Sequence, residues 1–325
     1  MKTYAIKGTP ARASRIAYGC MGIGGDWSSA PLTDQTRKDA MASVRTALDE
    51  GITFFDHADI YGRTKAEEAF SGIWKERPGL RPSIMVQTKC GIRFEDDPKG
   101  APARYDYSKE HILRTVEGSL KRLGTDYVDF LLLHRPDALV EPEEVAAAFD
   151  HLASQGKVRF FGVSNHNAWQ IELLKRWVTQ PLVVNQLEVN VLHNQLINAG
   201  VSVNQDAPAM PTHGEGTLEY CRLHDITIQA WSPLAHGAFG KAAAGQGDER
   251  ARKVVEVAQA MATQKGVSMD AILVAWLLRH PARIQPIIGT TKPDRIKAAC
   301  QADRVELSRE EWYRLLTAGK GGKVA

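Results

Sequence analysis

The stretch GITFFDHADIYG, residues 51–62, is an apolar run that stops abruptly at a charged residue. Its first half favours a short buried strand, and parallel α/β folds place their reacting side chains where such strands end. Asp56 would lie at that end and Tyr61 on the following loop, so a carboxylate and a phenol could face one cavity. The alternative is a plain loop in which Asp56 caps the next helix and Tyr61 only packs. The rest of the chain has to decide between these two interpretations.

Outward from residues 51–62, the chain alternates short apolar runs with amphipathic stretches of helical period. Strands are expected at residues 18–22, 54–56, 84–89, 127–133, 158–163, 182–189, 227–230 and 286–288. Helices are expected at residues 36–50, 64–77, 108–123, 142–154, 168–178, 218–223, 250–265, 269–279, 292–302 and 308–318. An N-terminal β-hairpin is expected from residues 4–6 and 14–17, with its turn at residues 8–10.

Close to eight strand–helix units with almost wholly apolar strands favour a parallel sheet that helices cover. No GxGxxG motif follows the first strand, which argues against the doubly wound dinucleotide-binding fold. We therefore predict an α/β fold, a (β/α)8 TIM barrel that forms a single domain over residues 1–325. It would carry the N-terminal β-hairpin and large loops at the C-terminal face, where the polar strand ends meet.

Two segments depart from this alternation. Residues 198–216, NAGVSVNQDAPAMPTHGEG, form a long stretch rich in Gly, Pro and Asn between the sixth strand and its helix. Because loops of this length are commonly functional, we expect a substrate-side lid; the alternative is a tolerated surface insertion. Residues 319–325 are expected to form a disordered tail.

Composition narrows the class of protein. The 325 residues are 43% hydrophobic and 24% charged, as in soluble globular proteins, and the net charge of +3 gives no reason to expect nucleic-acid or membrane binding. The four cysteines lack metal-site spacing and fit free thiols in a reducing cytoplasm. Neither a signal peptide nor an apolar span of bilayer length is present in the sequence. We expect a cytoplasmic protein without a metal site.

Polar residues stand at the ends of the expected strands. They are Asp56, Lys89, His134, Ser164, Asn165, Gln186, Trp231, Ser232, Gly289, Thr290 and Thr291. They belong to seven segments, GITFFDHADIYG, QTKCG, YVDFLLLHRPD, GKVRFFGVSNHN, VVNQLEVNVLH, IQAWSPLAHGAFGK and PIIGTTKPDRI. In content and order these segments resemble the aldo-keto reductases, over nearly the whole chain. The HADIYG and LLLHRPD motifs resemble a bacterial branch of that family.

The resemblance implies an oxidoreductase that interconverts carbonyls and alcohols, with Asp56, Tyr61, Lys89 and His134 as catalytic residues. Reduction of a carbonyl builds negative charge on its oxygen, so a proton donor is needed beside it, and Tyr61 would be that donor. Lys89 would lower the pKa of Tyr61, Asp56 would keep Lys89 charged, and His134 would hydrogen-bond the carbonyl. Taken singly, Lys89 could be a plain barrel-mouth ion pair and His134 a satisfied core histidine.

The same resemblance implies a nicotinamide cofactor, with NADPH (NADP⁺) preferred and NADH left open. Ser164, Asn165 and Gln186 would bond the carboxamide, and Trp231 would stack on the ring. Amides at the start of the last barrel helix would bind phosphate, and Arg295 aligns with an arginine that family members use on the 2′-phosphate. The full implied set is Met21, Gly22, Ser164, Asn165, Gln186, Trp231, Ser232, Pro233, Leu234, Gly237, Gly289, Thr290, Thr291, Lys292 and Arg295.

The chain departs from well-known members at Gly289, where many NADPH-specific enzymes have lysine, and Lys292 could compensate. A small carbonyl or alcohol compound is the expected partner, in contact with Trp27, His57 and Trp231, and a monomer or weak homo-oligomer is expected. One rival is a cofactor-binding regulatory barrel with little turnover. A second, a barrel hydrolase or isomerase, is disfavoured because the sequence shows no metal cluster and no paired catalytic carboxylates.

Overall fold

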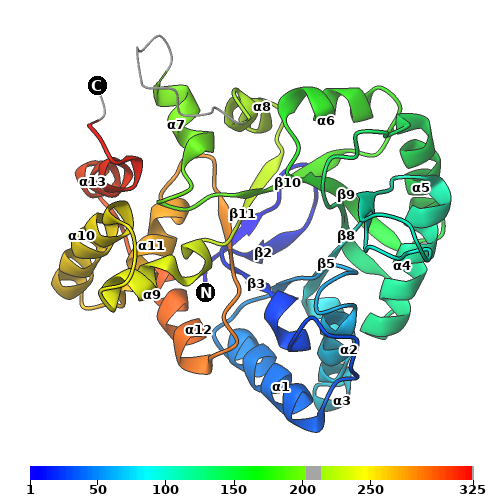
Figure 1. The fold of residues 1–325 in the computed structure, drawn as a ribbon, viewed down its shortest axis with the longest axis horizontal. Coiled ribbons are helices and arrows are strands. Elements are labelled where there is room, and N and C mark those ends of the chain that lie inside the picture. The colour runs from blue at the N-terminus through cyan, green and yellow to red at the C-terminus, as the bar shows by residue number, and fades with distance from the viewer. Residues whose placement is uncertain (203–213, 324–325) are drawn as a thin grey trace.

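A closed barrel of parallel strands forms the centre of the protein (Figure 1). The computed structural model describes residues 1–202 and 214–323. In that part of the chain the order is β3–β4–β5–β8–β9–β10–β11–β12, with β12 beside β3. These strands are β3 (Ala17–Gly19), β4 (Phe54–Asp56), β5 (Met85–Cys90), β8 (Val128–Leu133), β9 (Val158–Ser164), β10 (Leu182–Glu188), β11 (Thr227–Trp231) and β12 (Gln285–Ile288). The predicted (β/α)8 fold is confirmed.

Helices surround the barrel (Figure 1). They are α1 (Asp34–Asp49), α2 (Lys65–Ser71), α3 (Ile73–Glu76), α4 (Lys109–Leu123), α5 (Pro142–Ser154), α6 (Ala168–Lys175), α7 (Gln195–Val201), α8 (Thr217–Leu223), α9 (Ala238–Ala243), α10 (Glu249–Lys265), α11 (Met269–Leu278), α12 (Pro293–Cys300) and α13 (Arg309–Lys320). Short 3₁₀ turns lie at Cys20–Gly24, Arg81–Ser83, Ala235–Gly237 and Gln301–Arg304. Among the described residues, no helix is both long enough and apolar enough to span a bilayer.

Helix α4 shows how local sequence sets the element ends. The Ser108 hydroxyl accepts a hydrogen bond from the backbone N–H of His111, which satisfies a free donor of the first turn. At the other end, Gly124 has φ 64° and donates its N–H to the carbonyls of Leu120 and Lys121. That left-handed conformation costs little only for glycine, so the helix ends there.

Strand β8 shows how the barrel separates two apolar layers. Phe130 and Leu132 belong to the cluster inside the barrel, whereas Val128, Leu131 and Leu133 pack outward against the helices. Every residue of the strand is buried. Apart from Asp129, which forms ion pairs, both faces of the strand are apolar, and this explains why the sequence has a nearly continuous apolar run rather than an alternating one.

The predicted N-terminal hairpin, β1 (Thr3–Ala5) and β2 (Arg12–Ser14), covers the end at which the barrel strands begin. Ile6 and Ala13 join the inner cluster there, next to Phe54 and Val183 near the strand starts. The opposite, C-terminal end is therefore the one left for loops. A second antiparallel ribbon that the sequence did not predict, β6 (Ile92–Arg93) and β7 (Arg104–Tyr105), follows β5 on that side.

Two expected boundaries are wrong. Of the loop expected at residues 198–216, Asn198 to Val201 are helical and end α7, while residues 203–213 lie outside the described residues. The tail expected to be disordered from residue 319 begins later, because Gly319 and Lys320 close α13. A Cβ at Gly319 would collide with the carbonyl oxygen of Val191, so the glycine permits a close helix–loop contact. Residues 324 and 325 lie outside the described residues.

Candidate active site

Four polar side chains from neighbouring strand ends meet at the C-terminal face of the barrel. Asp56 ends β4, Lys89 is the fifth residue of β5, His134 follows β8, and Tyr61 lies on the loop between β4 and α2. Lys89 is 0%, Asp56 2% and His134 8% exposed. The strand-end rule located Asp56, Lys89 and His134, Tyr61 was expected on the loop after Asp56, and the structure brings the four side chains together.

The Lys89 ammonium is the centre of this group. Its Nζ lies 2.8 Å from Asp56 Oδ1, and it donates hydrogen bonds to the His57 carbonyl oxygen at 2.8 Å and to the Tyr61 hydroxyl at 2.9 Å. Three acceptors thus use the three N–H groups of a fully buried ammonium. This complete pairing is what makes a fully buried lysine charge tolerable.

Burial and charge shift the pKa values of this pair in a direction that suits proton donation. Burial alone would lower the pKa of Lys89, but the Asp56 charge and hydrogen bonds to Asp56 and Tyr61 outweigh it and raise that pKa. Burial raises the pKa of Tyr61, and the Lys89 charge only partly offsets this. Lys89 therefore lowers the pKa of Tyr61 as expected, but burial outweighs this effect, and Tyr61 keeps its proton at neutral pH.

His134 is a neutral imidazole. Burial, then the charges of Lys89 and Arg135, lower its pKa well below the usual range. Its ring meets that of Tyr61 edge-on, with centroids 5.9 Å apart, and its Nδ1 has no partner among the described residues. A neutral imidazole beside a phenol can hydrogen-bond the same oxygen atom that the phenol serves.

A chain of glutamine amides supports Asp56 from inside the barrel, and the sequence analysis missed most of it. Gln87 Nε2 donates to Asp56 Oδ1 at 2.6 Å and Gln186 Nε2 at 3.1 Å. Both also donate to Gln229 Oε1, and Gln229 Nε2 continues to Gln285 Oε1 at 2.9 Å. The Gln186 amide nitrogen, which was expected to hold a carboxamide, is therefore used within the barrel.

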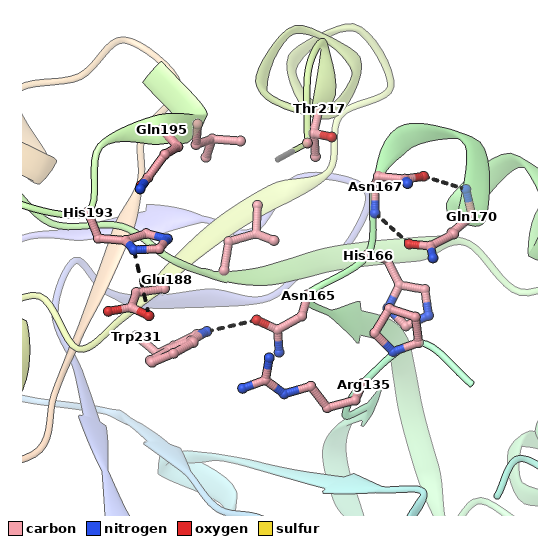
Figure 2. Close-up of a pocket in the computed structure, with 14 residues that line it drawn as sticks. Arg135, Asn165, His166, Asn167, Gln170, Glu188, His193, Gln195, Thr217 and Trp231 are labelled. Carbon is pink, nitrogen blue, oxygen red and sulfur yellow. Dashed lines mark hydrogen bonds and ion pairs between the residues drawn. The ribbon is translucent and has the colours of Figure 1, made fainter. Parts of the chain in front are cut away.

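Ser164, Asn165 and Trp231 form a second group that is tied to the first. Asn165 Nδ2 donates to the His134 carbonyl oxygen at 3.1 Å and to Ser164 Oγ at 2.9 Å. Asn165 Oδ1 accepts from Trp231 Nε1 at 3.1 Å (Figure 2). The indole is therefore held at a fixed angle at the mouth of the barrel, and its flat face can receive a ring.

A pocket of about 560 Å³ opens beside Trp231 and Asn165 (Figure 2). Arg135 lies on one side, with its guanidinium carbon 5.7 Å from the centroid of the Trp231 ring, and forms no ion pair among the described residues. Glu188 and Gln195 line the same pocket. Buried Thr217 Oγ1 and Gln195 Oε1 lack partners within residues 1–202 and 214–323. Such atoms favour a ligand that can hydrogen-bond to them.

The residues expected around the cofactor phosphates lie at the ends of β11 and β12. Lys292 caps α12, and Pro293, which has no N–H, opens it. The N–H groups of Arg295 and Ile296 both donate to the Lys292 carbonyl oxygen at 3.0 Å, which leaves the Asp294 N–H as the first-turn amide without a partner among the described residues. Two contacts hold Thr291, which lies just before this helix. Ser43 Oγ donates to the Thr291 carbonyl oxygen at 2.8 Å, and Gly22 lies against the Thr291 side chain. Gly289 has open space where a Cβ would be.

Arg295 on α12 lies 3.5 Å from Asp270 through its Nη2, and its side chain is 45% exposed. At this distance and exposure the ion pair is weak, so the guanidinium can turn to a phosphate. Ser232, Pro233, Leu234 and Gly237 follow β11, and the Ser232 hydroxyl shares a hydrogen bond with His236 at 3.2 Å. Met21 lies in the 3₁₀ turn after β3 and is 48% exposed.

The structure does not support two of the expected substrate contacts. His57 is fully buried, packs edge-on against Phe70 with centroids 4.6 Å apart, and cannot reach a ligand. Trp27 is 45% exposed on the loop after β3 and does not line the pocket beside Trp231. The sequence placed His57 one residue past a strand end, but residue 57 points outward because side chains alternate.

Lowering the pH is expected to destabilise the fold. Burial lowers the pKa of His57 to about 3 and that of His166 to about 4, against about 6.5 in an unfolded chain. Between these values the unfolded chain binds protons that the folded chain does not. The free energy of unfolding therefore falls as the pH drops below about 6.5, by up to ~1.4 kcal/mol per pH unit for each histidine.

The measurement is urea unfolding at a series of pH values from neutral to mildly acidic, with His57→Leu beside the wild type. Loss of one buried histidine should reduce by one the number of protons that the chain takes up on unfolding. The free energy of unfolding should therefore fall less steeply with falling pH in the variant. Equal slopes for the two proteins would contradict the assignment of His57.

Comparison with known proteins agrees with this geometry. The family model described as "Aldo/keto reductase family" matches residues 15–318. A 6-dehydroglucose reductase of Agrobacterium fabrum is 38% identical over 315 residues, 96% of each chain. The uncharacterized oxidoreductase YcsN of Bacillus subtilis is 40% identical over 285 residues, 86% of this chain and 88% of that one.

Among solved structures, the glycerol dehydrogenase AKR11B4 from Gluconobacter oxydans superposes with a TM-score of 0.80, covering 99% of this chain and 97% of that one at 24% identity. At this identity the match supports the fold alone. The family match and the two relatives go further: the chain belongs to the aldo/keto reductase family and is an oxidoreductase that interconverts carbonyls and alcohols with a nicotinamide cofactor.

Proposed function

We propose that this enzyme reduces small hydroxylated aldehydes with NADPH and that Tyr61 is its proton donor. One observation supports this most strongly. The Tyr61 hydroxyl lies 2.9 Å from Lys89 Nζ, which lies 2.8 Å from Asp56 Oδ1, all at the C-terminal ends of barrel strands. Loss of NADPH-dependent aldehyde reduction in Tyr61→Phe is the experiment that tests it.

Each residue of the group has a chemical task in this mechanism. A bound nicotinamide supplies the hydride. Tyr61 holds a proton at neutral pH and gives it to the carbonyl oxygen as charge develops there. The Lys89 ammonium stabilises the phenolate that remains, and Asp56 keeps Lys89 charged and in place. The neutral His134 hydrogen-bonds the same oxygen and fixes the angle at which the carbonyl lies.

The chain's own residues fit such a cofactor. The Trp231 indole offers a flat face at the barrel mouth, held by Asn165. The Asp294 amide at the start of α12, the exposed side chain of Lys292 and the open space at Gly289 suit a phosphate. Trp231 would hold the nicotinamide end of the cofactor. Ser232 and the residues at the start of α12 would hold its phosphate groups. No contact among the described residues favours the alternative, a regulatory barrel with little turnover.

Arg295 is proposed to select NADPH over NADH through its charge. Arg295→Ala is expected to raise KM for NADPH by roughly tenfold or more, because a charge-assisted bond to phosphate contributes about 1.5–3 kcal/mol. KM for NADH should change little. Lys297→Ala, on the same helix and also exposed, is the matched control. Equal shifts for the two cofactors would contradict a role in phosphate recognition.

The proposed substrate class follows from the pocket beside Trp231. Its lining combines Arg135 and Glu188 with the unpartnered oxygens of Gln195 and Thr217. Each such oxygen leaves a hydrogen-bond site that a substrate hydroxyl group would satisfy. The relative from Agrobacterium fabrum is named for a sugar aldehyde, which supports the same class for this chain.

A further inference from the structure

Helix α6 lies on the outside of the barrel (Figure 1), and it exposes a row of large apolar side chains. Trp169 is 81%, Leu173 45% and Trp177 39% exposed. The positions are four residues apart, so they share one face of α6 and the turn that continues it, where the Trp177 N–H donates to the Leu174 carbonyl oxygen. The opposite face, with Ile171 and Leu174, is buried.

The order of this row is symmetric about its centre. Reading outward from Leu173, the chain meets a tryptophan four residues away in either direction. A two-fold axis through Leu173 would therefore lay the row of one copy antiparallel on the row of another, with each Trp169 opposite a Trp177. A self-complementary surface of this kind is what an isologous dimer requires.

Opposite charges lie beside the row, and their midpoint is one residue from Leu173. Glu172 and Arg176 lie four residues apart along one flank. Glu172 pairs with Lys175 at 2.8 Å and also bonds Tyr220, whereas Arg176 has no acidic partner among the described residues. In the antiparallel arrangement, Arg176 of one copy comes alongside Glu172 of the other, so that opposite charges meet.

We propose that this chain forms a two-fold homodimer in which α6 packs against α6 of a second copy. Tryptophan is enriched at the energetic centre of such interfaces. A stable interface buries about 1,200–2,000 Å² in total, which one helix does not supply. The neighbouring α5 and α8, which contact α6, would provide the rest. Asn167 and Gln170 on α6 line the pocket beside Trp231, so the interface would lie next to the active site.

Sedimentation equilibrium of the full chain tests the dimer. The wild type should show twice the chain mass of 35.8 kDa, and Leu173→Glu should show the chain mass alone. Tyr105→Glu is the matched control, since Tyr105 is 44% exposed on the β6–β7 ribbon, which is no part of the proposed interface, and the change should leave the dimer intact. Circular dichroism checks that each variant folds.

A disulfide test addresses the symmetry directly. Residue 173 would lie on the axis and meet its own copy, so Leu173→Cys should form a disulfide-linked dimer under mild oxidation, whereas Tyr105→Cys should not. All four native cysteines are buried and do not compete. A monomeric wild type, or a dimer that survives Leu173→Glu, would overturn the proposal; the row would then serve another partner or none.

Discussion

Tyr61→Phe is expected to lower kcat for aldehyde reduction by about 10²–10⁴-fold, the range that general acids contribute. The change removes one oxygen, the one that lies 2.9 Å from Lys89 Nζ. Because burial keeps the phenol protonated, no neighbouring group has the same combination of proton and position. The Kd for NADPH, from quenching of tryptophan fluorescence, should stay within a few-fold of the wild type.

Tyr105→Phe is the control for this experiment, because Tyr105 lies on the β6–β7 ribbon at the same face and is 44% exposed. Its kcat should equal that of the wild type. A Tyr61→Phe enzyme that keeps more than a tenth of wild-type kcat would show that another group supplies the proton.

Lys89→Met is expected to lower the free energy of unfolding by about 3–5 kcal/mol, because breaking one half of a buried ion pair leaves an uncompensated charge. Asp56 is only 2% exposed, and Lys89 is its cationic partner at 2.8 Å. Gln87 and Gln186 would still donate to Asp56, which tempers the loss. Urea unfolding of the wild type and the variant, fitted with one common dependence of the free energy of unfolding on urea concentration, measures the change.

The double variant Asp56→Asn with Lys89→Met separates stability from catalysis. Removing both charges should recover most of the lost free energy of unfolding, while kcat stays as low as in Lys89→Met. A single variant that unfolds like the wild type would contradict the assignment of a buried ion pair. A double variant no more stable than the single one would also contradict it.

The sequence predicted the barrel because burial on both faces of parallel strands produces apolar runs that are easy to read. Phe130 to Leu133 is such a run, and the bounds of its strand were expected within one residue. The four polar residues were found for a related reason: Asp56, Lys89 and His134 interrupt or follow apolar runs, and Tyr61 lies on the loop that Asp56 begins. A carboxylate or ammonium at such a position stands out in the sequence because the residues around it are apolar.

The glutamine chain and the position of His57 could not be read in the same way. Gln87 and Gln229 lie inside strands, next to apolar residues such as Val86 and Ile228. Only the closure of the barrel brings the two glutamines close to Asp56 and to each other. Whether a strand residue points inward depends on register, and an error of one position reverses it. His57 was misplaced for that reason, because it stands one residue past Asp56 and faces the helices.

Helix α9 and the β6–β7 ribbon were missed because they are short and lack a clear apolar period. The extent of α13 was underestimated because glycine disfavours helix in general. At Gly319 the close approach of the Val191 carbonyl leaves no room for any other residue. Tertiary contact thus overrides local preference at that position.

Transfer of deuterium to glyceraldehyde from NADPH that carries deuterium at both C4 positions, in ordinary water, tests the proposed activity most directly. If Tyr61, Lys89, His134 and Asp56 act as proposed, mass spectrometry of the product should find glycerol with one deuterium on the former carbonyl carbon. The Tyr61→Phe enzyme should form almost none of it over the same time. Glycerol without deuterium, or equal amounts from the two enzymes, would contradict the proposed mechanism.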